Sequence, residues 1–254
     1  MNPIITLLTD FGPADSYVGE VKGRLLSLVP AATLVDLSHD IAPGDVVAAS
    51  YVLGRAWREF PAGTVHLAVV DPGVGTARRA LAVEAAGHRF VAPDNGLLSE
   101  VFAAAHADVV SLAGPEGASR TFHGRDVFAP AAARLALGVA LVELGAPVRD
   151  LVHLPPRRPR AEGADVIGQV VHVDRFGTLV TNVPASACRE GVEVHVGRHV
   201  VPLHETFGDV PAGSPVAFVG SGGTLEVAVR DGRAEAVLGC GRGAEVRVTG
   251  GRPG

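Results

Sequence analysis

Residues 64–81 read TVHLAVVDPGVGTARRAL, and this stretch decides the fold. Apart from one histidine, its first seven residues are apolar or β-branched, which is typical of a strand covered on both faces. Asp71 ends the run, a Pro-Gly-Val-Gly turn follows, and Arg78 and Arg79 come directly before another apolar run. The pattern predicts two strands joined by a glycine turn, with a carboxylate at the carboxyl end of the first.

Strands and helices alternate along residues 1–150. Apolar runs predict strands at 4–9, 33–37, 64–70, 79–85, 88–93 and 107–112, with helical segments at 16–29, 44–58, 96–105 and 126–144. Alternation of this kind predicts a layered α/β domain with a mostly parallel sheet. In the first helix, Gly19 and Gly23 lie one turn apart, which predicts a face that another backbone approaches closely. The alternative is that these glycines reflect composition alone.

A different pattern follows the sequence LVHLPPRRPRAEGA at 151–164, whose prolines and arginines predict an exposed linker. Residues 165–254 contain short β-rich runs separated by Gly, Pro and Asp, without a long helical period. Such runs predict a small antiparallel barrel or sandwich. The expected domains are therefore 1–150 and 165–254.

Composition and charge exclude several classes of function. The chain has 254 residues, a net charge of −5 and a single lysine, Lys22, whereas nucleic-acid binding calls for a basic face. Cys188 and Cys240 lack the spacing of metal ligands or of a redox pair, and no apolar run is long enough to span a membrane. Because a signal-peptide pattern is also missing, we expect a cytoplasmic protein that binds neither nucleic acid nor membrane.

Carboxylates follow three of the predicted strands. Asp10, Asp40 and Asp71 come after the first, second and third apolar runs. Ligands of open parallel sheets bind outside the carboxyl ends of the strands, so we expect a site at this edge. Asp10 is suited to accept hydrogen bonds from the two hydroxyls of a ribose. The alternative is that Asp10 lies in a loop and Asp15 caps the next helix.

The glycine turn after Asp71 does not have the features of a phosphate-binding loop. No Gly-Lys-Ser/Thr follows it, and a strand rather than a helix comes next, which excludes Walker and dinucleotide-binding motifs. The alternative to a functional Asp71 is a strand-exit turn in which its side chain bonds backbone amides. Similarly, the sequence RTFHGRDVF at 120–128 leaves His123 open as a half-buried histidine and favours Asp126 as a helix N-cap.

A metal site has little support in the sequence. His39, Asp40 and Asp45 lie close together in LSHDIAPGD at 37–45, but neither an HExxH nor an HxHxD pattern is present. We therefore expect no metal.

Seven segments, taken in order, resemble one family of enzymes. The segments are LLTDFG…DSYVGEVKG, VDLSHDIAPGDVVAASYVL, VHLAVVDPGVGTARR, VAPDNGLLSEVF, TFHGRDVFAPAAARLALG, VDRFGTLVTNV and GSGGTLEVAV. They are similar to the adenosine-forming S-adenosyl-L-methionine (SAM) hydrolases, also called SAM hydroxide adenosyltransferases, which are related to fluorinase and chlorinase. The resemblance runs over nearly the whole chain.

This resemblance implies a subunit with an N-terminal α/β domain and a C-terminal β-barrel domain. It further implies a homotrimer that holds SAM between the N-terminal domain of one subunit and the C-terminal domain of its neighbour. The implied reaction converts SAM and water into adenosine and L-methionine, with SAM as substrate and no cofactor.

The resemblance also assigns residues. The water-activating Asp, Arg and His of the family correspond to Asp71, Arg78 and His123, and its ribose-binding aspartate corresponds to Asp10. Our hypothesis is that Arg78 polarises the water, Asp71 orients it and His123 helps to remove the proton. The alternative exchanges the duties of Asp71 and His123. Asn95 is a further candidate for the substrate site, either behind these residues or in a helix-start turn.

In the second half, the resemblance assigns contacts with the methionine and adenine ends of SAM to Asp174, Phe176 and Ser221. Asp174 is expected to pair with the α-ammonium of methionine. Thr178 stands where family members usually carry Asn, which leaves adenine recognition open because Thr has a single hydroxyl. Glu226 is expected to be an exposed strand residue rather than a ligand.

Three features distinguish the chain from the halogenases that the family resembles. Those enzymes lack the Asp-Pro-Gly-Val-Gly turn and carry Tyr at the places of Asp71 and His123, and fluorinases have an N-terminal insertion that is missing here. The resemblance therefore favours water as the nucleophile. Two other functions remain as alternatives, a halide-dependent 5′-halo-5′-deoxyadenosine synthase and a non-catalytic protein that binds SAM or adenosine.

Overall fold

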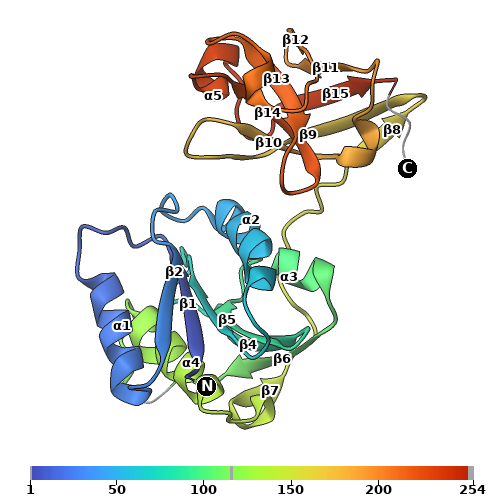
Figure 1. Cartoon of the computed structure of the whole chain (residues 1–254). Coiled ribbons are helices and arrows are strands. Elements are labelled where there is room, and N and C mark those ends of the chain that lie inside the picture. Colours follow the sequence, from blue (N-terminus) through green and yellow to red (C-terminus); the bar gives the residue numbers. More distant parts are fainter. Residues whose placement is uncertain (1, 115–116, 251–254) are drawn as a thin grey trace. The chain divides into compact units, whose positions relative to one another are not determined.

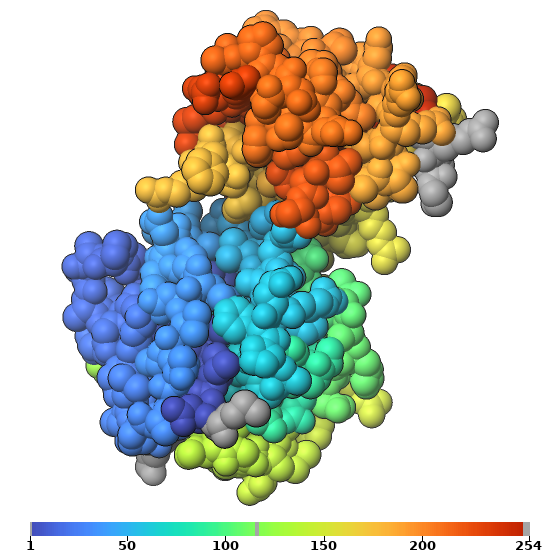
Figure 2. All heavy atoms as spheres, in the orientation of Figure 1, coloured from blue at the N-terminus to red at the C-terminus, as the bar shows by residue number. Residues whose placement is uncertain are grey.

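Residues 2–114 and 117–250 are described by the computed structural model, in which the chain separates into two units, residues 1–154 and 155–254 (Figure 1). The first unit combines helices with a sheet and the second is built of antiparallel strands, so the predicted fold class is confirmed. Figure 2 shows the heavy atoms of both units, the first in blue to green and the second in yellow to red. Among the described residues, no helix has the length and apolar character needed to cross a bilayer.

The sheet of the N-terminal unit has the strand order β2-β1-β3-β5-β4-β6-β7. Its strands are β1 (Ile4–Thr9), β2 (Thr33–Ser38), β3 (Val65–Val69), β4 (Ala80–Ala85), β5 (His88–Pro93), β6 (Ala107–Leu112) and β7 (Gly145–Pro147). Strands β2, β1, β3 and β5 pair in parallel, whereas β4, β6 and β7 add to them in antiparallel pairs. The sheet is therefore mixed rather than mostly parallel as predicted, and its parallel part carries the carboxylates that follow β1 and β3.

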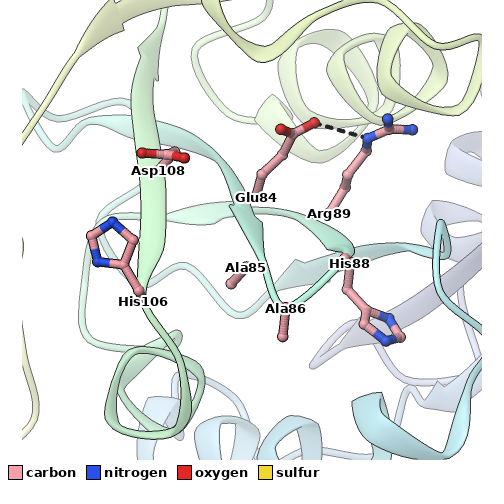
Figure 3. Close-up of a pocket in the computed structure, with 8 residues that line it drawn as sticks. Glu84, Ala85, Ala86, His88, Arg89, His106 and Asp108 are labelled. Atoms are coloured by element: carbon pink, nitrogen blue, oxygen red, sulfur yellow. Dashed lines mark hydrogen bonds and ion pairs between the residues drawn. The ribbon is translucent and has the colours of Figure 1, made fainter.

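A tight hairpin explains the antiparallel part. Only Ala86 and Gly87 join β4 to β5, and both have positive φ, 49° and 79°, as a two-residue type I′ turn requires. Strands joined by so short a loop must run antiparallel. Figure 3 shows an open hollow at this hairpin, with the Glu84–Arg89 ion pair of 3.0 Å on one side and His88 directed to the other. The hollow lies at the end of β4 and β5 remote from the turn after Asp71.

Helices cover both faces of this sheet (Figure 1). They are α1 (Tyr17–Leu28) and α4 (Ala129–Ala136) on one face, and α2 (Val46–Ala56) and α3 (Ser99–Ala104) on the other. Along β3, Val65, Leu67 and Val69 pack toward α1 and α4. Ala68 and Val70 pack toward α2 and α3. Because both faces are buried, the strand is apolar at nearly every position, as its sequence predicts.

The segment predicted as one helix over 126–144 is divided. Gly124–Phe128 form a π-helical turn, and α4 follows it. The prediction that Asp126 caps a helix is wrong, because its carboxylate instead accepts hydrogen bonds from the Ser119 amide (3.0 Å) and from Arg125. A π-helical turn of this kind is frequently found at functional sites.

The C-terminal unit is an antiparallel barrel that nearly closes. Its strands follow the order β12-β11-β15-β9-β10-β14-β13, with β8 paired to β9. The elements are β8 (Arg160–Glu162), β9 (Asp165–Val173), β10 (Leu179–Pro184), β11 (Glu193–Val196), β12 (His199–Val201), β13 (Pro215–Val219), β14 (Thr224–Val229), α5 (Ala234–Leu238) and β15 (Glu245–Thr249). The Ala217 amide donates to Pro202 O and the His204 amide to Ala217 O, both at 2.9 Å, so the chain beyond β12 rejoins β13. Apolar side chains fill the interior.

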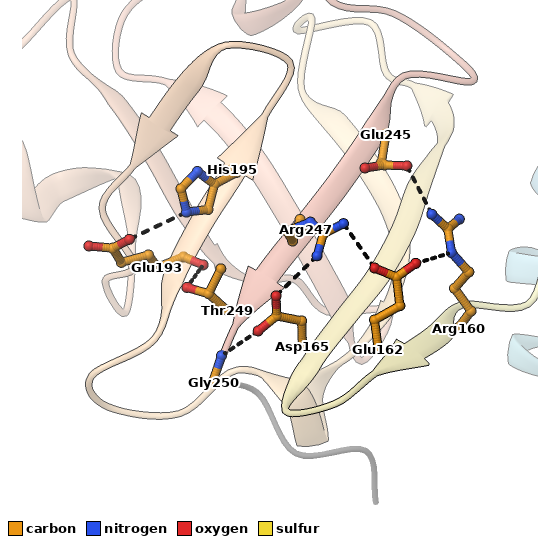
Figure 4. Close-up of polar contacts among 9 residues, drawn as sticks. All are labelled: Arg160, Glu162, Asp165, Glu193, His195, Glu245, Arg247, Thr249 and Gly250. Carbon is orange, nitrogen blue, oxygen red and sulfur yellow. Dashed lines mark hydrogen bonds and ion pairs between the residues drawn. The ribbon is translucent and has the colours of Figure 1, made fainter.

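Two arginines link β8, β9 and β15 on the outside of this barrel (Figure 4). Arg247 pairs with Glu162 and Asp165, and Arg160 pairs with Glu162 and Glu245, at 3.1–3.2 Å. Ion pairs as exposed as these contribute little stability each. Strand β8, which begins soon after the segment between the two units, is paired through its backbone with β9, and these side chains connect it to β15 as well.

The close backbone approach that Gly19 and Gly23 predicted is not found at these positions. Both glycines are exposed, and a Cβ atom on either would meet no described atom within 4 Å. A close contact between helices occurs instead at Gly54 in α2, where a Cβ would lie 2.7 Å from the side-chain Cβ of Glu100 in α3. Glycine spacing alone does not reveal which helix face meets a neighbour.

A row of hydrogen-bonded side chains crosses the centre of the N-terminal sheet. Thr6 on β1 reaches His66 on β3, with Oγ1 and Nδ1 2.8 Å apart, and His66 Nε2 lies 3.1 Å from Nδ1 of His88 on β5. The three residues are buried, and the His66 ring stacks on Phe90 with centroids 4.9 Å apart. Burial, with the charge of His88 as a smaller cause, lowers the pKa of His66 to about 3.

Substitution by alanine is expected to have opposite effects on stability at Gly23 in α1 and at Gly54 in α2. Gly23→Ala should raise the free energy of unfolding by about 0.5–1 kcal/mol, because alanine favours the helix and the space is open. Gly54→Ala should lower it by about 1–3 kcal/mol, because the new methyl group collides with Glu100. Urea unfolding of both variants tests this, and an equal stabilisation by the two would contradict it.

The buried histidine predicts how stability depends on pH. Because the folded-state pKa of His66 lies below the unfolded value, the unfolded chain binds more protons, and stability is lost as the pH falls from about 6.5. Compared with His66→Gln, the wild type should lose about 1.4 kcal/mol more for each pH unit between 6.5 and 4.5. Thr6→Val is the control, since it removes the hydrogen-bond partner but no titrating group and should keep the wild-type slope. Equal slopes for wild type and His66→Gln would refute this prediction.

Candidate active site

The candidate site is built on the turn that leads from β3 to β4. Asp71 and Arg78 stand at the two ends of this turn, and glycines allow it to close. A Cβ on Gly73 would lie 3.3 Å from Arg78 Cγ, and one on Gly75 would lie 2.5 Å from the carbonyl oxygen of Arg120. Gly75 also has a φ of 77°. Glycine is thus needed both to return Arg78 to Asp71 and to admit the segment that leads to His123.

The structure brings Asp71, Arg78 and His123 together. Arg78 Nε donates to both oxygens of Asp71, at 3.0 and 2.9 Å, and its Nη2 donates to Asp71 Oδ2 as well. The same Nη2 lies 2.8 Å from His123 Nδ1. The side chains of Asp71 and Arg78 are only 5% and 10% exposed, so the ion pair is largely removed from solvent. The guanidinium also lies over the Phe128 ring, 5.1 Å from its centroid.

The arginine determines which nitrogen of His123 carries the proton. A guanidinium has only donors, so His123 Nδ1 must accept the hydrogen bond, and the proton of the neutral ring lies on Nε2. Burial, followed by the positive charge of Arg78, lowers the pKa of His123. His123 is therefore a neutral imidazole with an N–H donor on the side away from Arg78.

Asp10 lies at the neighbouring strand end. It follows β1, which pairs in parallel with β3, and its Oδ2 accepts a hydrogen bond from the Gly44 amide at 2.8 Å. Gly44 in turn lies against Pro72, since a Cβ there would be 3.6 Å from Pro72 Cβ. The loop after β2 thus joins the surroundings of Asp10 to those of Asp71.

The residues considered for a metal or a helix cap have separate roles. His39 Nε2 lies 3.1 Å from Asp36 Oδ1, Asp45 is the N-cap of α2, and Asp40 is exposed. In the part of the chain that the structure describes, no group of three His, Cys, Asp or Glu side chains could hold a metal ion. Asp15 is exposed and precedes α1 by two residues.

An aromatic cluster that the sequence analysis did not identify borders the site. Phe11 follows Asp10 and Phe122 precedes His123, and the two rings meet edge to face with centroids 5.9 Å apart. Tyr17 at the start of α1 completes the cluster, 6.1 and 5.3 Å from them. The available signal was the position of an aromatic residue directly beside two candidate polar residues. The cluster gives the site an apolar wall.

Asn95 lies behind the turn rather than facing outward. Its Nδ2 donates to Val70 O at 2.8 Å, and its Oδ1 accepts from the Leu97 amide at 3.2 Å. Both ends of the side-chain amide are therefore engaged with backbone.

Within the C-terminal unit, Asp174 organises the loop between β9 and β10. Its Oδ1 accepts hydrogen bonds from the amides of Phe176 (2.9 Å) and Thr178 (2.8 Å). Phe176, at the tip, is 77% exposed, whereas Thr178 is buried beneath the loop. The loop thus presents an aromatic ring and the second oxygen of Asp174.

Ser221 and Glu226 belong to the neighbouring hairpin. Ser221 is exposed in the loop between β13 and β14. Glu226 on β14 is half-buried rather than exposed as expected, because its carboxyl group lies across Gly220, where a Cβ would be 2.0 Å from Oε1. The glutamate packs behind the loop that carries Ser221.

Comparisons with known proteins agree over both units. Family models described as the SAM hydroxide adenosyltransferase N-terminal and C-terminal domains match residues 5–145 and 168–247. A Thermus thermophilus protein named (R)-S-adenosyl-L-methionine hydrolase is 43% identical over 98% of this chain and 100% of that protein. An Actinoplanes fluorinase is 28% identical over 89% of this chain and 91% of that protein. The crystal structure of an uncharacterized conserved protein from Thermotoga maritima has a TM-score of 0.91 and 37% identity, covering 96% and 99% of the two chains.

Proposed function

The chain belongs to the SAM hydroxide adenosyltransferase family, and we propose that it hydrolyses S-adenosyl-L-methionine to adenosine and L-methionine. The observation that carries this proposal is the convergence of Asp71, Arg78 and His123 at the carboxyl end of β3. The Thermus thermophilus relative, which matches over the full length, supports the same reaction by its name.

The chemistry of the substrate limits what the protein must supply. In SAM, the ribose C5′ carbon bears a sulfonium, so the departing methionine leaves as a neutral thioether and needs neither an acid nor a cofactor. Water is a weak nucleophile, and the main task is to hold it behind C5′ in line with the sulfur. In well-aligned reactions, orientation of this kind lowers the activation barrier by about 7 kcal/mol or more.

The hydrogen bonds around His123 favour one division of duties. Nε2 already carries a proton and Nδ1 accepts from Arg78, so the ring could take up a proton only by losing the arginine. We therefore assign proton removal to Asp71 and a donor role to His123, which is the alternative to the hypothesis drawn from the sequence. Carboxylate oxygens have two acceptor positions each, so Asp71 can bond both Arg78 and water.

A carboxylate is a sufficient base for this step. As the bond between the water oxygen and C5′ forms and the C5′–S bond breaks, the electron pair of the latter goes to sulfur and the attacking oxygen becomes strongly acidic. Its proton passes to Asp71 in the same step, before the bond to C5′ is complete, and then from Asp71 to solvent. Arg78 and the Nε2–H of His123 stabilise the hydroxide character that the oxygen acquires as the proton leaves.

Substrate binding extends this proposal beyond the first unit. Asp10 is suited to bind the ribose hydroxyls through its oxygen that does not contact Gly44. We further propose a homotrimer in which Asp174, Phe176 and Ser221 of a neighbouring subunit contact the substrate. The 77% exposure of Phe176 supports an aromatic surface available to a ligand or to another subunit. The two free cysteines support a cytoplasmic location.

Product analysis tests the reaction directly. Incubation of the purified protein with SAM should release adenosine and methionine in equal amounts. In the presence of chloride, adenosine should remain the nucleoside product, because water is the nucleophile. A chlorinated nucleoside would indicate halide transfer, and tight binding of SAM without turnover would indicate a binding protein.

Substitutions at His123 test the proposed donor role. His123→Ala should lower kcat by about 100-fold, the effect of losing one donor to developing negative charge. His123→Gln should retain about ten times the activity of the alanine variant, because a glutamine amide can accept from Arg78 and still donate an N–H. Asp71→Asn keeps the shape but removes the proton acceptor, and it should be at least as impaired as His123→Ala. Equal inactivity of the Gln and Ala variants would assign the base to His123.

A further inference from the structure

We propose that Asp94 and Asn95, consecutive residues at the end of β5, are positioning residues that hold the two ends of the Asp71–Arg78 turn. This inference rests on the hydrolase reaction proposed above. Neither side chain reaches the reacting atoms in this scheme, because each is engaged with protein groups of the turn or its neighbours.

The order of the strands places these residues beneath the turn. In the sheet, β5 lies between β3 and β4, so the turn that joins β3 to β4 must cross the carboxyl end of β5. Pro93, the last residue of β5, is paired with Ala80 at the beginning of β4. Asp94 and Asn95 follow it directly and are therefore located where the turn begins and ends.

Asn95 holds the first end of the turn. Its Nδ2 donates to the carbonyl oxygen of Val70, the residue before Asp71, at 2.8 Å. Its Oδ1 accepts from the Leu97 amide, which fixes the orientation of the side chain. The bond therefore sets the direction in which the chain leaves β3.

Asp94 holds the other end. Its side chain is 3% exposed, and Oδ2 accepts from Arg79 Nε at 2.8 Å while Oδ1 accepts from the Val152 amide at 2.9 Å. The Asp94 amide also donates to Arg79 O at 2.9 Å. Arg79 reaches Asp150 as well, at 2.8 Å. The bonds with Asp94 turn Arg79 away from the site, so that the adjacent Arg78 is directed toward Asp71.

The turn requires such restraint because of its composition. Gly73 and Gly75 permit the conformation but do not limit the chain to it, since glycine has access to more backbone conformations than any other residue. A misplacement of about 1 Å can cost roughly 100-fold in rate. An ion pair between a buried carboxylate and a 31% exposed arginine, as in Asp94–Arg79, contributes little net stability, which favours a positional role for it.

Substitution of Asn95 by aspartate tests the first end. Asn95→Asp keeps the size and the acceptor for Leu97 but loses the donor to Val70 O. We expect kcat for SAM hydrolysis to fall by about 100-fold, with KM within about threefold of wild type. Adenosine binding, measured by calorimetry, should keep one site per chain, which separates misalignment from a loss of folded protein.

Asn182 provides a matched control in the other unit. Its Nδ2 donates to Arg157 O and its Oδ1 accepts from the Gln169 amide, both at 2.7 Å, so Asn182→Asp makes the same change to the same bonding pattern. It should reduce the melting temperature about as much as Asn95→Asp does while leaving kcat within about threefold of wild type. An equal loss of kcat in the control would reduce the effect to general destabilisation and overturn the proposal.

The second end has its own pair of variants. Arg79→Lys retains the charge beside Asp94 but cannot reproduce the paired bonds of the guanidinium, and kcat should fall at least about tenfold. Asp150→Asn alters an exposed partner of the same arginine, and kcat should stay within about threefold of wild type. This pair decides the matter if Asn95→Asp does not fold.

Two further outcomes would overturn the inference. The first is that Asn95→Asp and Arg79→Lys both keep kcat within about threefold of wild type. The second is that kcat falls only in proportion to the number of adenosine-binding sites lost. A wild-type protein that releases no adenosine from SAM would instead refute the proposed function itself, so the two failures are distinguishable.

Discussion

The ion pair between Asp71 and Arg78 is the contact on which the rest of the site depends. Its largely buried carboxylate directs the guanidinium so that one remaining N–H reaches His123. Because arginine can only donate, this single contact also fixes the tautomer of His123. Charge, orientation and proton position therefore follow from one interaction. The glycine turn between Asp71 and Arg78 allows this ion pair to form.

Much of the fold could be predicted from the sequence because strands buried on both faces are recognisable as apolar runs. Strands β1 and β3 are mostly apolar because helices cover both faces of the sheet, and the aspartates after them are located at strand ends. The mixed pairing was harder to predict, because the hairpin is made by Ala86 and Gly87, and alanine is not a usual residue at positive φ. The helix predicted over 126–144 is divided before α4 for a different reason. Pro130 has no N–H to offer the carbonyl of Asp126, so a regular helix cannot run through this segment.

Contacts between residues far apart in the chain could not be predicted from such patterns. The site joins Arg78 to His123, 45 residues later, and Val70 to Asn95, 25 residues later. Neither separation has the period of a helix or a strand, so only the folded chain shows that they meet. The resemblance to a family supplied the identity of the trio, but it could not supply the tautomer of His123 or the partners of Asn95. Those depend on the direction of individual hydrogen bonds.

The pairing of buried charges also suits the proposed substrate. Asp71 and Asp94 are each matched by their own arginine, and His123 is neutral, so the turn adds no net charge near a bound sulfonium. An unpaired carboxylate close to the sulfur would bind the cationic ground state more tightly than a transition state in which sulfur is losing its charge, and it would slow the reaction. With Arg78 beside it, Asp71 can accept a proton from the attacking water without that disadvantage. The arginine thus serves the reaction twice, by placing the water and by limiting the attraction between the carboxylate and the cationic substrate.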